Sequence, residues 1–348
     1  MTEPSPQPRP QPIARTVGFQ PGERNVFLHL LTACNLSCRH CYINPAQHGS
    51  ATLPRTTALR WLELFARPGK KTNLVLLGGE PTLHPDLAAL IRAAKAMEYS
   101  VTVDSNGFLF HDLLAATTPA ELDYLSFSLD GPDAATNDPV RGEGVFAVCT
   151  QNIRRAVAAG FNTSLIYTVS ARNIDQLHRM PALLEALGVR RFFIQVIGLR
   201  GNSARPEEAA GETWQVDPDR WLRIVPQVAA DAARLGIHVV YPKVYLGADE
   251  PFQCAGLVAE NYFIFPNGRV YRCPLCEDYP IHSLKIEADR LIRRSGLNED
   301  RFFPLNIPEG CVMNRLLQPG NITYLPSGAP AHRISCCLLK EEMLPLRP

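Results

Sequence analysis

The chain has 348 residues, of which 20% are charged, and a formal net charge of +1 at pH 7. This length suits one large domain with a smaller one beside it, and the near-neutral charge argues against an electrostatic nucleic-acid-binding surface. No run approaches the ~18 apolar residues of a membrane-spanning helix, and the N-terminus lacks the basic-then-apolar order of a signal peptide. We therefore expect a cytoplasmic protein whose ten cysteines are thiols or metal ligands rather than disulfides.

The first 24 residues have prolines at every second position from 4 to 12, few apolar residues and no periodicity. We interpret residues 1–24 as a flexible or polyproline-like arm. Between residues 25 and 245, strand patterns alternate with helix patterns, which predicts an α/β fold with a parallel sheet built from βαβ units. The strand patterns begin near residues 26, 74, 101, 124, 164 and 192. Six units are too few for a closed eight-stranded barrel.

Three cysteines follow the first strand pattern at CxxxCxxC spacing: Cys34, Cys38 and Cys41. Four thiolates normally bind an iron-sulfur cluster, so a cluster held by three would leave one iron open to another ligand. The alternative is a structural zinc site, in which the three cysteines join His40 or His48. Zinc ligands more often come as two CxxC pairs, and this favours the iron-sulfur interpretation.

The run from Cys34 to Cys41, with an aromatic ring directly before the last cysteine, resembles the signature of the radical S-adenosylmethionine (SAM) superfamily. Three further runs occur in the order and at the spacing of that superfamily: Gly78-Gly-Glu-Pro81, Ser105-Asn-Gly107 and Ser128-Leu-Asp-Gly131. The resemblance covers about residues 25–240. It implies that the six β/α units form an open, partial (β/α)6 TIM-like barrel, with the active site at the carboxyl ends of the strands.

The same resemblance implies the chemistry. The open iron of a [4Fe-4S] cluster on the three cysteines would chelate the amino and carboxylate groups of SAM. One electron would split the sulfonium into methionine and a 5′-deoxyadenosyl radical, which takes a hydrogen atom from the substrate. An external one-electron donor of the flavodoxin or ferredoxin type is implied as a partner.

The family pattern also implies the residues that contact SAM. They are His40, Gly78, Gly79, Glu80, Asn106, Ser128, Asp130 and Arg141. The two glycines suit close backbone contact with the methionyl amine, and the glutamate shapes their turn. The serine and the aspartate are expected near the ribose and methionyl groups, the backbone around the histidine near adenine, and the arginine near the SAM carboxylate. Residues 195–204 follow the sixth strand, where the family lays backbone against adenine.

A second cysteine pattern begins beyond residue 246. Cys254 is followed after thirteen residues by Gly268 and after four more by Cys273, and residues 263–271 predict a hairpin over Asn-Gly. This resembles the start of the SPASM or shorter twitch extensions, which bind auxiliary iron-sulfur clusters. We therefore expect residues 246–348 to form a small, cysteine-rich α+β extension.

Six cysteines remain for this extension when Cys149 is set aside as an ordinary helix residue. Six cannot supply two four-cysteine sites, so we predict one auxiliary [4Fe-4S] cluster on Cys254, Cys273, Cys311 and Cys336. Cys276 and Cys337 are rival ligands, since a CxxC pair suits either iron-sulfur or zinc. A structural zinc ion is the alternative occupant.

Three functional classes follow from these patterns. The first is a radical SAM enzyme that modifies a peptide or small metabolite, because SPASM and twitch extensions are common in enzymes that mature peptides, proteins or cofactors. The second applies the same chemistry to a nucleoside, sugar or lipid. The third is a non-catalytic iron-sulfur or zinc-binding protein. The stretch before residue 25 is too short for a precursor-recognition domain, so the peptide hypothesis requires that module on a separate chain.

Overall fold

The computed structural model describes residues 12–110, 112–205 and 213–345. Within them the main sheet has thirteen strands in the order β1-β15-β8-β7-β6-β5-β4-β3-β2-β10-β11-β12-β13. In this sheet order, each pair of neighbours in the run β8-β7-β6-β5-β4-β3-β2-β10 is parallel. The pairs on either side of the run, in β1-β15-β8 and in β10-β11-β12-β13, are antiparallel. The parallel strands are β2 (Arg24–His29), β3 (Thr72–Leu77), β4 (Tyr99–Ser105), β5 (Tyr124–Ser128), β6 (Thr163–Val169), β7 (Arg191–Val196), β8 (His238–Pro242) and β10 (Glu260–Ile264).

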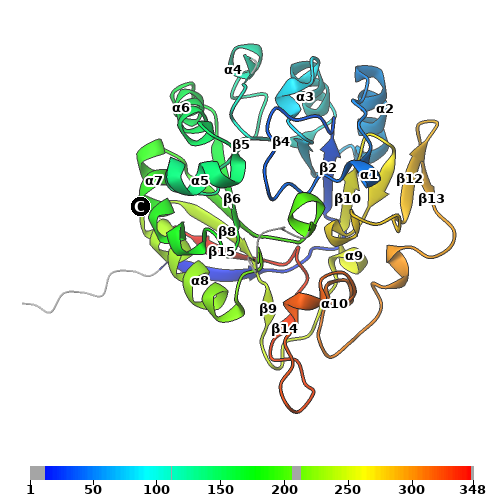
Figure 1. Ribbon diagram of the computed structural model, residues 1–348. Helices are drawn as coiled ribbons and strands as arrows, with labels where there is room; N and C mark the ends of the chain where they lie inside the picture. The colour runs from blue at the N-terminus through cyan, green and yellow to red at the C-terminus, as the bar shows by residue number, and fades with distance from the viewer. Residues whose placement is uncertain (1–11, 111, 206–212, 346–348) are drawn as a thin grey trace, which may run out of the picture.

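The sheet is curved, and its helices cover the outer side (Figure 1). They are α2 (Arg55–Phe65), α3 (Leu87–Ala96), α4 (Leu113–Ala116), α5 (Ala134–Arg141), α6 (Val145–Ala158), α7 (Met180–Leu187) and α8 (Pro218–Arg234). These helices lie between consecutive strands from β2 to β8, as the alternation of helix and strand patterns predicted. In α3 the buried residues recur at helical spacing, so one face of this helix packs on the sheet. No helix in the described part of the chain is both long and apolar enough to cross a bilayer.

The six predicted strands coincide with β2 to β7, and the expected α/β partial barrel is confirmed. Two further parallel strands enlarge it, because β8 lies beside β7 and β10 lies beside β2. Over the described residues the sheet ends in β1 on one side and β13 on the other, so it curves without closing.

The N-terminal arm differs from its prediction. Within it, β1 (Ile13–Val17) pairs antiparallel with β15 (Lys340–Leu344), so the prediction of a flexible arm is wrong for this segment. All five side chains of β1 are exposed, and the segment therefore shows no apolar alternation by which a strand is recognised. Backbone pairing and polar contacts such as Arg15 Nη2 to Glu342 Oε2 at 2.6 Å hold it in place. Residues 1–11 of the predicted arm lie outside the described residues.

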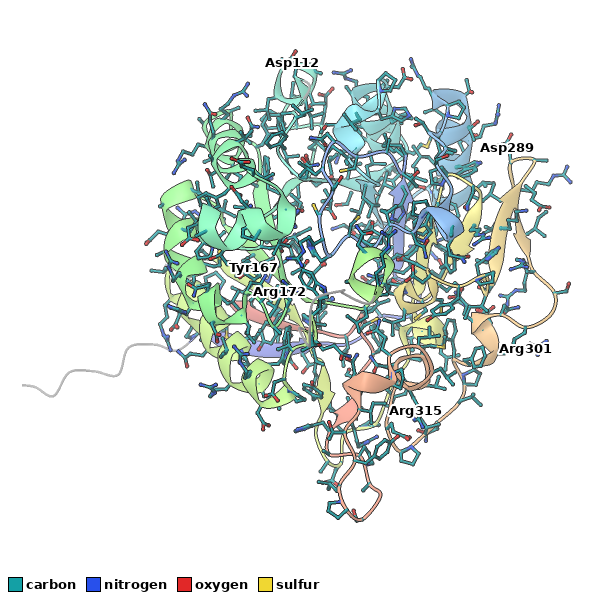
Figure 2. The ribbon with its side chains drawn as sticks, in the orientation of Figure 1. Asp112, Tyr167, Arg172, Asp289, Arg301 and Arg315 are labelled. Atoms are coloured by element: carbon teal, nitrogen blue, oxygen red, sulfur yellow. The ribbon has the colours of Figure 1, made fainter. Side chains whose placement is uncertain are left out.

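The predicted extension adds strands to both sides of the barrel sheet. The hairpin over Asn-Gly is confirmed as β10 and β11 (Arg269–Tyr271), followed by β12 (Leu284–Glu287) and β13 (Arg290–Arg293). Asp289, at the tip of the last hairpin in Figure 2, lies 2.6 Å from Arg60 of α2. The remaining elements are α1 (Pro45–His48), β9 (Tyr245–Leu246), α9 (Ala255–Val258), α10 (Val312–Leu317) and β14 (Arg333–Ile334). The extension is therefore continuous with the barrel.

Candidate functional site

The predicted site residues lie at the carboxyl ends of neighbouring parallel strands. The cysteine triplet and His40 follow β2, the Gly78–Glu80 turn follows β3, Asn106 follows β4, and Ser128 and Asp130 lie at the end of β5. Arg141 is the last residue of α5, directly beyond them. This is the edge of a parallel β/α sheet at which ligands bind.

The turn after β3 holds the backbone just before the first cysteine. The Gly79 amide donates to Leu31 O at 2.9 Å, and the Glu80 amide donates to Ala33 O at 3.0 Å. A Cβ atom on Gly79 would lie 2.1 Å from Ala33 O, and one on Gly78, where φ is +150°, would lie 2.2 Å from Leu31 O. Only glycine allows this approach. Docking of the cysteine loop is thus a structural reason for both glycines, besides the cofactor contact expected from sequence.

Replacing Gly79 with alanine should displace the cysteine loop, because the added methyl group would overlap the Ala33 carbonyl. We expect the variant to fold but to retain less than about half of the iron of the first site, since a ligand set must be held in place to bind metal. Iron analysis after anaerobic reconstitution measures this loss. The variant Gly18→Ala is the control, since a methyl group there meets no atom within 4 Å at an exposed position without a left-handed backbone, and iron binding equal in both variants would contradict the prediction.

Glu80 links the ends of β3 and β4. Its buried Oε1 accepts hydrogen bonds from the Thr82 amide and hydroxyl and from Ser105 Oγ, and its Oε2 accepts from the Asn106 amide at 2.7 Å. Burial raises the pKa of Glu80, and these donors oppose the rise. The Asn106 side chain in turn donates to Asn35 Oδ1 at 2.9 Å and approaches Cys34 Sγ at 3.6 Å. Glu80 therefore orients the residue that contacts the first cysteine.

The three cysteine side chains share one environment. Burial raises the pKa of each thiol, and each is raised further by one of the other two: Cys34 by Cys41, Cys38 by Cys34, and Cys41 by Cys38. The Arg141 guanidinium opposes this rise at Cys38 and Cys41. The loop thus gathers three thiols beside a cation that favours the thiolate, the form in which cysteine binds metal.

Asp130 pairs with two other predicted site residues. Its Oδ2 lies 2.7 Å from Arg141 Nε and 3.0 Å from His40 Nε2, and its Oδ1 accepts from the Thr168 amide at 2.8 Å. Burial alone would raise the pKa of Asp130, but Arg141 and His40 hold it well below its usual range. The carboxylate is therefore ionised and fixes the orientation of both partners. Ser128 ends β5, where its carbonyl oxygen accepts from the Cys149 thiol of α6.

Two buried nitrogen atoms of the cysteine loop fit a polar ligand. Among the described residues, no hydrogen-bond partner meets Asn35 Nδ2 or His40 Nδ1. A buried polar atom without a partner costs about 1–3 kcal/mol, so an occupant whose hydrogen-bonding groups reach both nitrogens would stabilise this end of the sheet. SAM carries both donor and acceptor groups.

Asp104 is a site residue that the sequence analysis missed. It alternates along β4 with Val101 and Val103, which are buried against the helices, so its side chain lies on the concave face of the sheet. Its register neighbour is Ser126. Burial raises the pKa of Asp104 to about 7, a rise that Ser126 opposes. The strand alternation before Ser105 was the signal that could have identified this carboxyl group.

The raised pKa of Asp104 predicts a pH dependence of stability. The folded protein binds this proton more tightly than the unfolded chain, so the stabilisation is complete below about pH 4 and is lost as pH rises to about 7. Asp104→Asn removes the effect and should make the protein more stable than wild type at about pH 8, by at most roughly 4 kcal/mol. Partial solvent access from the concave face makes this an upper limit. Urea unfolding of iron-free protein at about pH 5 and pH 8 measures it; identical pH dependence in both proteins would contradict it.

The six remaining predicted cysteines gather in a second site. Four pairs of these cysteines are in side-chain contact: Cys254–Cys336, Cys336–Cys337, Cys273–Cys337 and Cys273–Cys276. Cys311, whose pKa burial raises to about 12, lies within electrostatic reach of Cys336. All ten cysteines of the chain are free thiols. In the described part of the chain no group of three or more His, Cys, Asp or Glu side chains has the arrangement for a single metal ion. The choice of ligands among the six stays a prediction.

Comparison with known proteins identifies the family. The model of the radical SAM superfamily matches residues 28–184, which include the cysteine triplet and every predicted SAM-contacting residue. PqqA peptide cyclase of Ruegeria pomeroyi is 31% identical over 265 residues, covering 75% of this chain and 70% of that protein. The chain belongs to the radical SAM superfamily. This radical SAM protein is therefore an enzyme, and its family implies a [4Fe-4S] cluster and SAM. The hypothesis of a non-catalytic metal-binding protein is set aside.

Two further likenesses define how far the match extends. Pre-heme d1 synthase of Dinoroseobacter shibae is 32% identical over 189 residues, 53% of this radical SAM chain and 46% of that protein. The first curated relatives are thus matched over about half to two thirds of their own length. The crystal structure of Streptococcus suis SuiB bound to precursor peptide SuiA superposes with a TM-score of 0.59 at 12% identity, covering 86% of this chain and 66% of that one. At that identity the likeness supports the fold alone.

Proposed function

We propose that this radical SAM enzyme removes a hydrogen atom from a peptide substrate and carries one auxiliary [4Fe-4S] cluster. The observation that carries the proposal is the convergence of six cysteines from four separate segments of the extension. The relative named PqqA peptide cyclase supports a peptide substrate, and SuiB, whose fold this chain resembles, was crystallised with a precursor peptide.

The first site has the donor set that this chemistry needs. Cys34, Cys38 and Cys41 would hold a cluster with one open iron. SAM bound there would supply the chemistry that the family implies, a reductive cleavage of the sulfonium by one electron from an external donor of the flavodoxin or ferredoxin type, followed by removal of hydrogen from the substrate. The chain's own task is to hold the three thiolates, orient SAM and exclude competing reactions.

The surrounding residues suit the charged groups of SAM. Arg141 meets Asp130 through Nε, and its guanidinium would donate hydrogen bonds to the SAM carboxylate. We propose that the Asp104 carboxyl group complements the cationic amino and sulfonium groups. Asn35 Nδ2 is a buried donor and His40 Nδ1 a buried ring nitrogen that polar atoms of SAM would satisfy. No residue of the chain is assigned a role in the hydrogen transfer itself.

The auxiliary ligand set that we propose is Cys254, Cys273, Cys311 and Cys336. Each of these four thiols affects the pKa of at least one other member, so together they form a connected group. Cys276 also contacts Cys273 and lies within electrostatic reach of Cys337, so it stays a rival ligand. Cys337 contacts Cys273 and Cys336, but neighbouring cysteines in sequence seldom bind the same metal, so it is a reserve ligand.

Iron analysis tests the proposal. After anaerobic reconstitution we expect about eight irons and eight sulfides per chain for two cubane clusters. The double variant Cys254→Ala/Cys311→Ala should retain about four, because only the auxiliary site is lost. Dithionite and SAM should still give 5′-deoxyadenosine with this variant. Four irons in the wild-type protein together with one zinc would contradict the auxiliary cluster and leave the first site intact.

The substrate class has its own test. A peptide encoded by a small open reading frame beside the gene is the probe, incubated with enzyme, SAM and dithionite. The peptide proposal expects a change in peptide mass that depends on SAM. Formation of 5′-deoxyadenosine with unchanged peptide would instead favour a small metabolite, the second candidate, which the likeness to a protein named pre-heme d1 synthase supports.

A further inference from the structure

The loop after β7 holds the backbone of the first cysteine site. Its short turn Gly201–Ala204 places the Asn202 amide 2.8 Å from Cys41 O and the Asn202 side-chain amide 3.0 Å from Cys38 O. A Cβ atom on Gly201, where φ is +55°, would lie 2.5 Å from Cys41 O. This loop is therefore in direct contact with the segment that carries two of the three cysteines.

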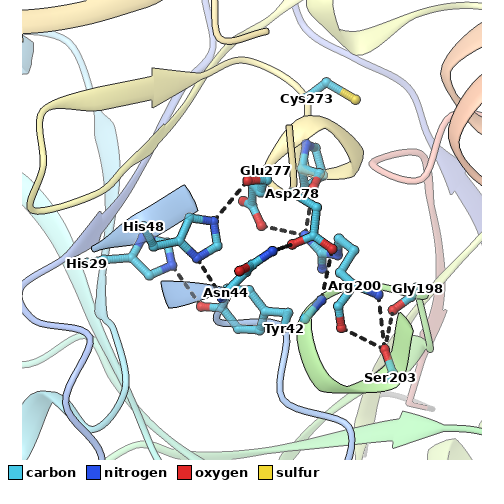
Figure 3. Close-up of polar contacts among 12 residues, drawn as sticks. His29, Tyr42, Asn44, His48, Gly198, Arg200, Ser203, Cys273, Glu277 and Asp278 are labelled. Atoms are coloured by element: carbon cyan, nitrogen blue, oxygen red, sulfur yellow. Dashed lines mark hydrogen bonds and ion pairs between the residues drawn. The ribbon is translucent and has the colours of Figure 1, made fainter. Parts of the chain in front are cut away.

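The same loop also holds the turn of the auxiliary site. Arg200 Nη1 donates to Pro274 O at 2.6 Å and to Glu277 Oε2 at 2.5 Å, so its guanidinium lies against the residues that follow Cys273. The Gly201 amide donates to Asp278 Oδ2 at 2.9 Å. Figure 3 shows Arg200 reaching across to Glu277, with Cys273 just beyond. Three consecutive residues thus hold both cysteine-bearing segments.

Further contacts join the two segments around Arg200. Asn44 Nδ2, three residues after Cys41, donates to Asp278 Oδ1 at 3.2 Å, and His48 Nε2 lies 3.0 Å from Glu277 O. The Arg200 guanidinium carbon is 5.2 Å from the centre of the Tyr42 ring, within the range of a cation–π contact. These side chains form one connected polar group in Figure 3.

Arg200 is the cation of this group, and it is largely withdrawn from water. Its side chain is 20% exposed and that of Glu277 is 2% exposed. Its charge lies close to both sites, since the guanidinium contacts the ring of Tyr42, the residue after Cys41, and the carbonyl oxygen of Pro274, the residue after Cys273. Reduction adds an electron to a cluster, and a nearby cation with little solvent screening stabilises the reduced state.

We propose that Arg200 is a positioning residue that fixes the two cysteine sites relative to each other, and that its charge raises the reduction potentials of the clusters at both. The auxiliary half of this statement rests on the proposed auxiliary cluster. The positional half does not, because the hydrogen bonds join protein segments only.

The experiment uses Arg200→Gln, Arg200→Lys and a matched control. Arg24→Gln is that control, because Arg24 also joins a carboxylate, Glu260 Oε2 at 2.5 Å, and a backbone carbonyl, Phe65 O at 3.0 Å, but at the opposite end of β2. Hydrogen exchange on iron-free protein should show faster exchange in both residues 35–44 and residues 272–278 for Arg200→Gln. Faster exchange in one segment alone, or equally in Arg24→Gln, would overturn the positional half.

Redox titration followed by electron paramagnetic resonance tests the charge. In Arg200→Gln both cluster potentials should become more negative than in wild type, Arg200→Lys should restore part of the shift, and Arg24→Gln should leave both unchanged. Reduction potentials that do not move in Arg200→Gln would overturn the proposal.

If Arg200→Gln fails to fold, Glu277→Gln is the second test, because it removes the negative charge that opposes Arg200. Both reduction potentials should then become less negative, and unchanged potentials would overturn the proposal. If only about four irons bind to wild type, the auxiliary cluster itself is absent, and the exchange result still decides the positional half.

Discussion

Replacing any one of Cys34, Cys38 or Cys41 with alanine should abolish the reductive cleavage of SAM. Three thiolates are the fewest that can hold a cubane cluster with one open iron, so no thiolate can be lost without losing that iron. We expect 5′-deoxyadenosine, measured by chromatography after anaerobic incubation with dithionite and SAM, to fall at least about 100-fold, since loss of a residue that merely supports a metal ligand already costs up to about 100-fold. Iron should fall from about eight to about four per chain.

Cys149→Ala is the matched control for these variants. Cys149 is a fully buried cysteine of α6, and its thiol donates to Ser128 O rather than joining the triplet. Its replacement should cost only modest stability and leave both the iron content and 5′-deoxyadenosine formation near wild type. Turnover that survives in a triplet variant, or is lost equally in Cys149→Ala, would refute the assignment of the triplet as cluster ligands.

Replacing Asp130 with alanine should destabilise the fold more than any other single substitution among the residues predicted to contact SAM. The change leaves the Arg141 guanidinium, 7% exposed, without its counter-charge and the Thr168 amide without its acceptor. Removing one partner of a buried ion pair costs about 3–5 kcal/mol. Denaturant unfolding of iron-free protein measures the loss without a contribution from bound metal.

Asp133→Ala separates burial from charge in this experiment. Asp133 lies three residues further along, pairs with Arg179 at 2.6 Å and caps α5 through the Thr136 amide, but both partners of its ion pair are substantially exposed. Loss of the cap and of an exposed pair should cost about 1 kcal/mol. The burial argument fails if Asp130→Ala costs no more than this control. Asp130→Asn, which keeps a hydrogen-bond acceptor, should fall between the two.

Strand and helix patterns were sufficient for the central barrel. The strands β2 to β7 and the helices between them have apolar residues at the spacing of their own secondary structure, because one face of each packs in the core. The same argument explains the missed strand β1: its side chains are all exposed, and its partner β15 lies more than 300 residues away, as in the Arg15–Glu342 contact. An edge strand without a buried face has no local signature.

The functional site likewise has features that a local sequence pattern indicates and features that depend on distant parts of the chain. The spacing of Cys34, Cys38 and Cys41 is local, and so is the Gly-Gly-Glu turn that follows β3. The reason for the two glycines is not local, because the backbone that their Cβ atoms would strike belongs to residues 31–33 of another strand end. Likewise, strand alternation indicates that Asp104 faces away from the helices, but the burial that raises its pKa arises only when the sheet has formed.

The family, its cofactors and the strand order of the barrel core could be inferred from the amino-acid sequence, since cysteine spacing, turn residues and apolar periodicity are properties of short segments. Tertiary structure alone decided which distant groups meet: Asp130 with Arg141 and His40, the six cysteines of the extension with one another, and Arg200 with both cysteine-bearing turns. These contacts depend on how the curved sheet brings the carboxyl ends of its strands together, and on β10 and β15 adding the extension to its two sides. No local sequence pattern indicates that segments far apart in the chain will be in contact, because the burial and charge pairing that stabilise such a contact arise only when the sheet has formed.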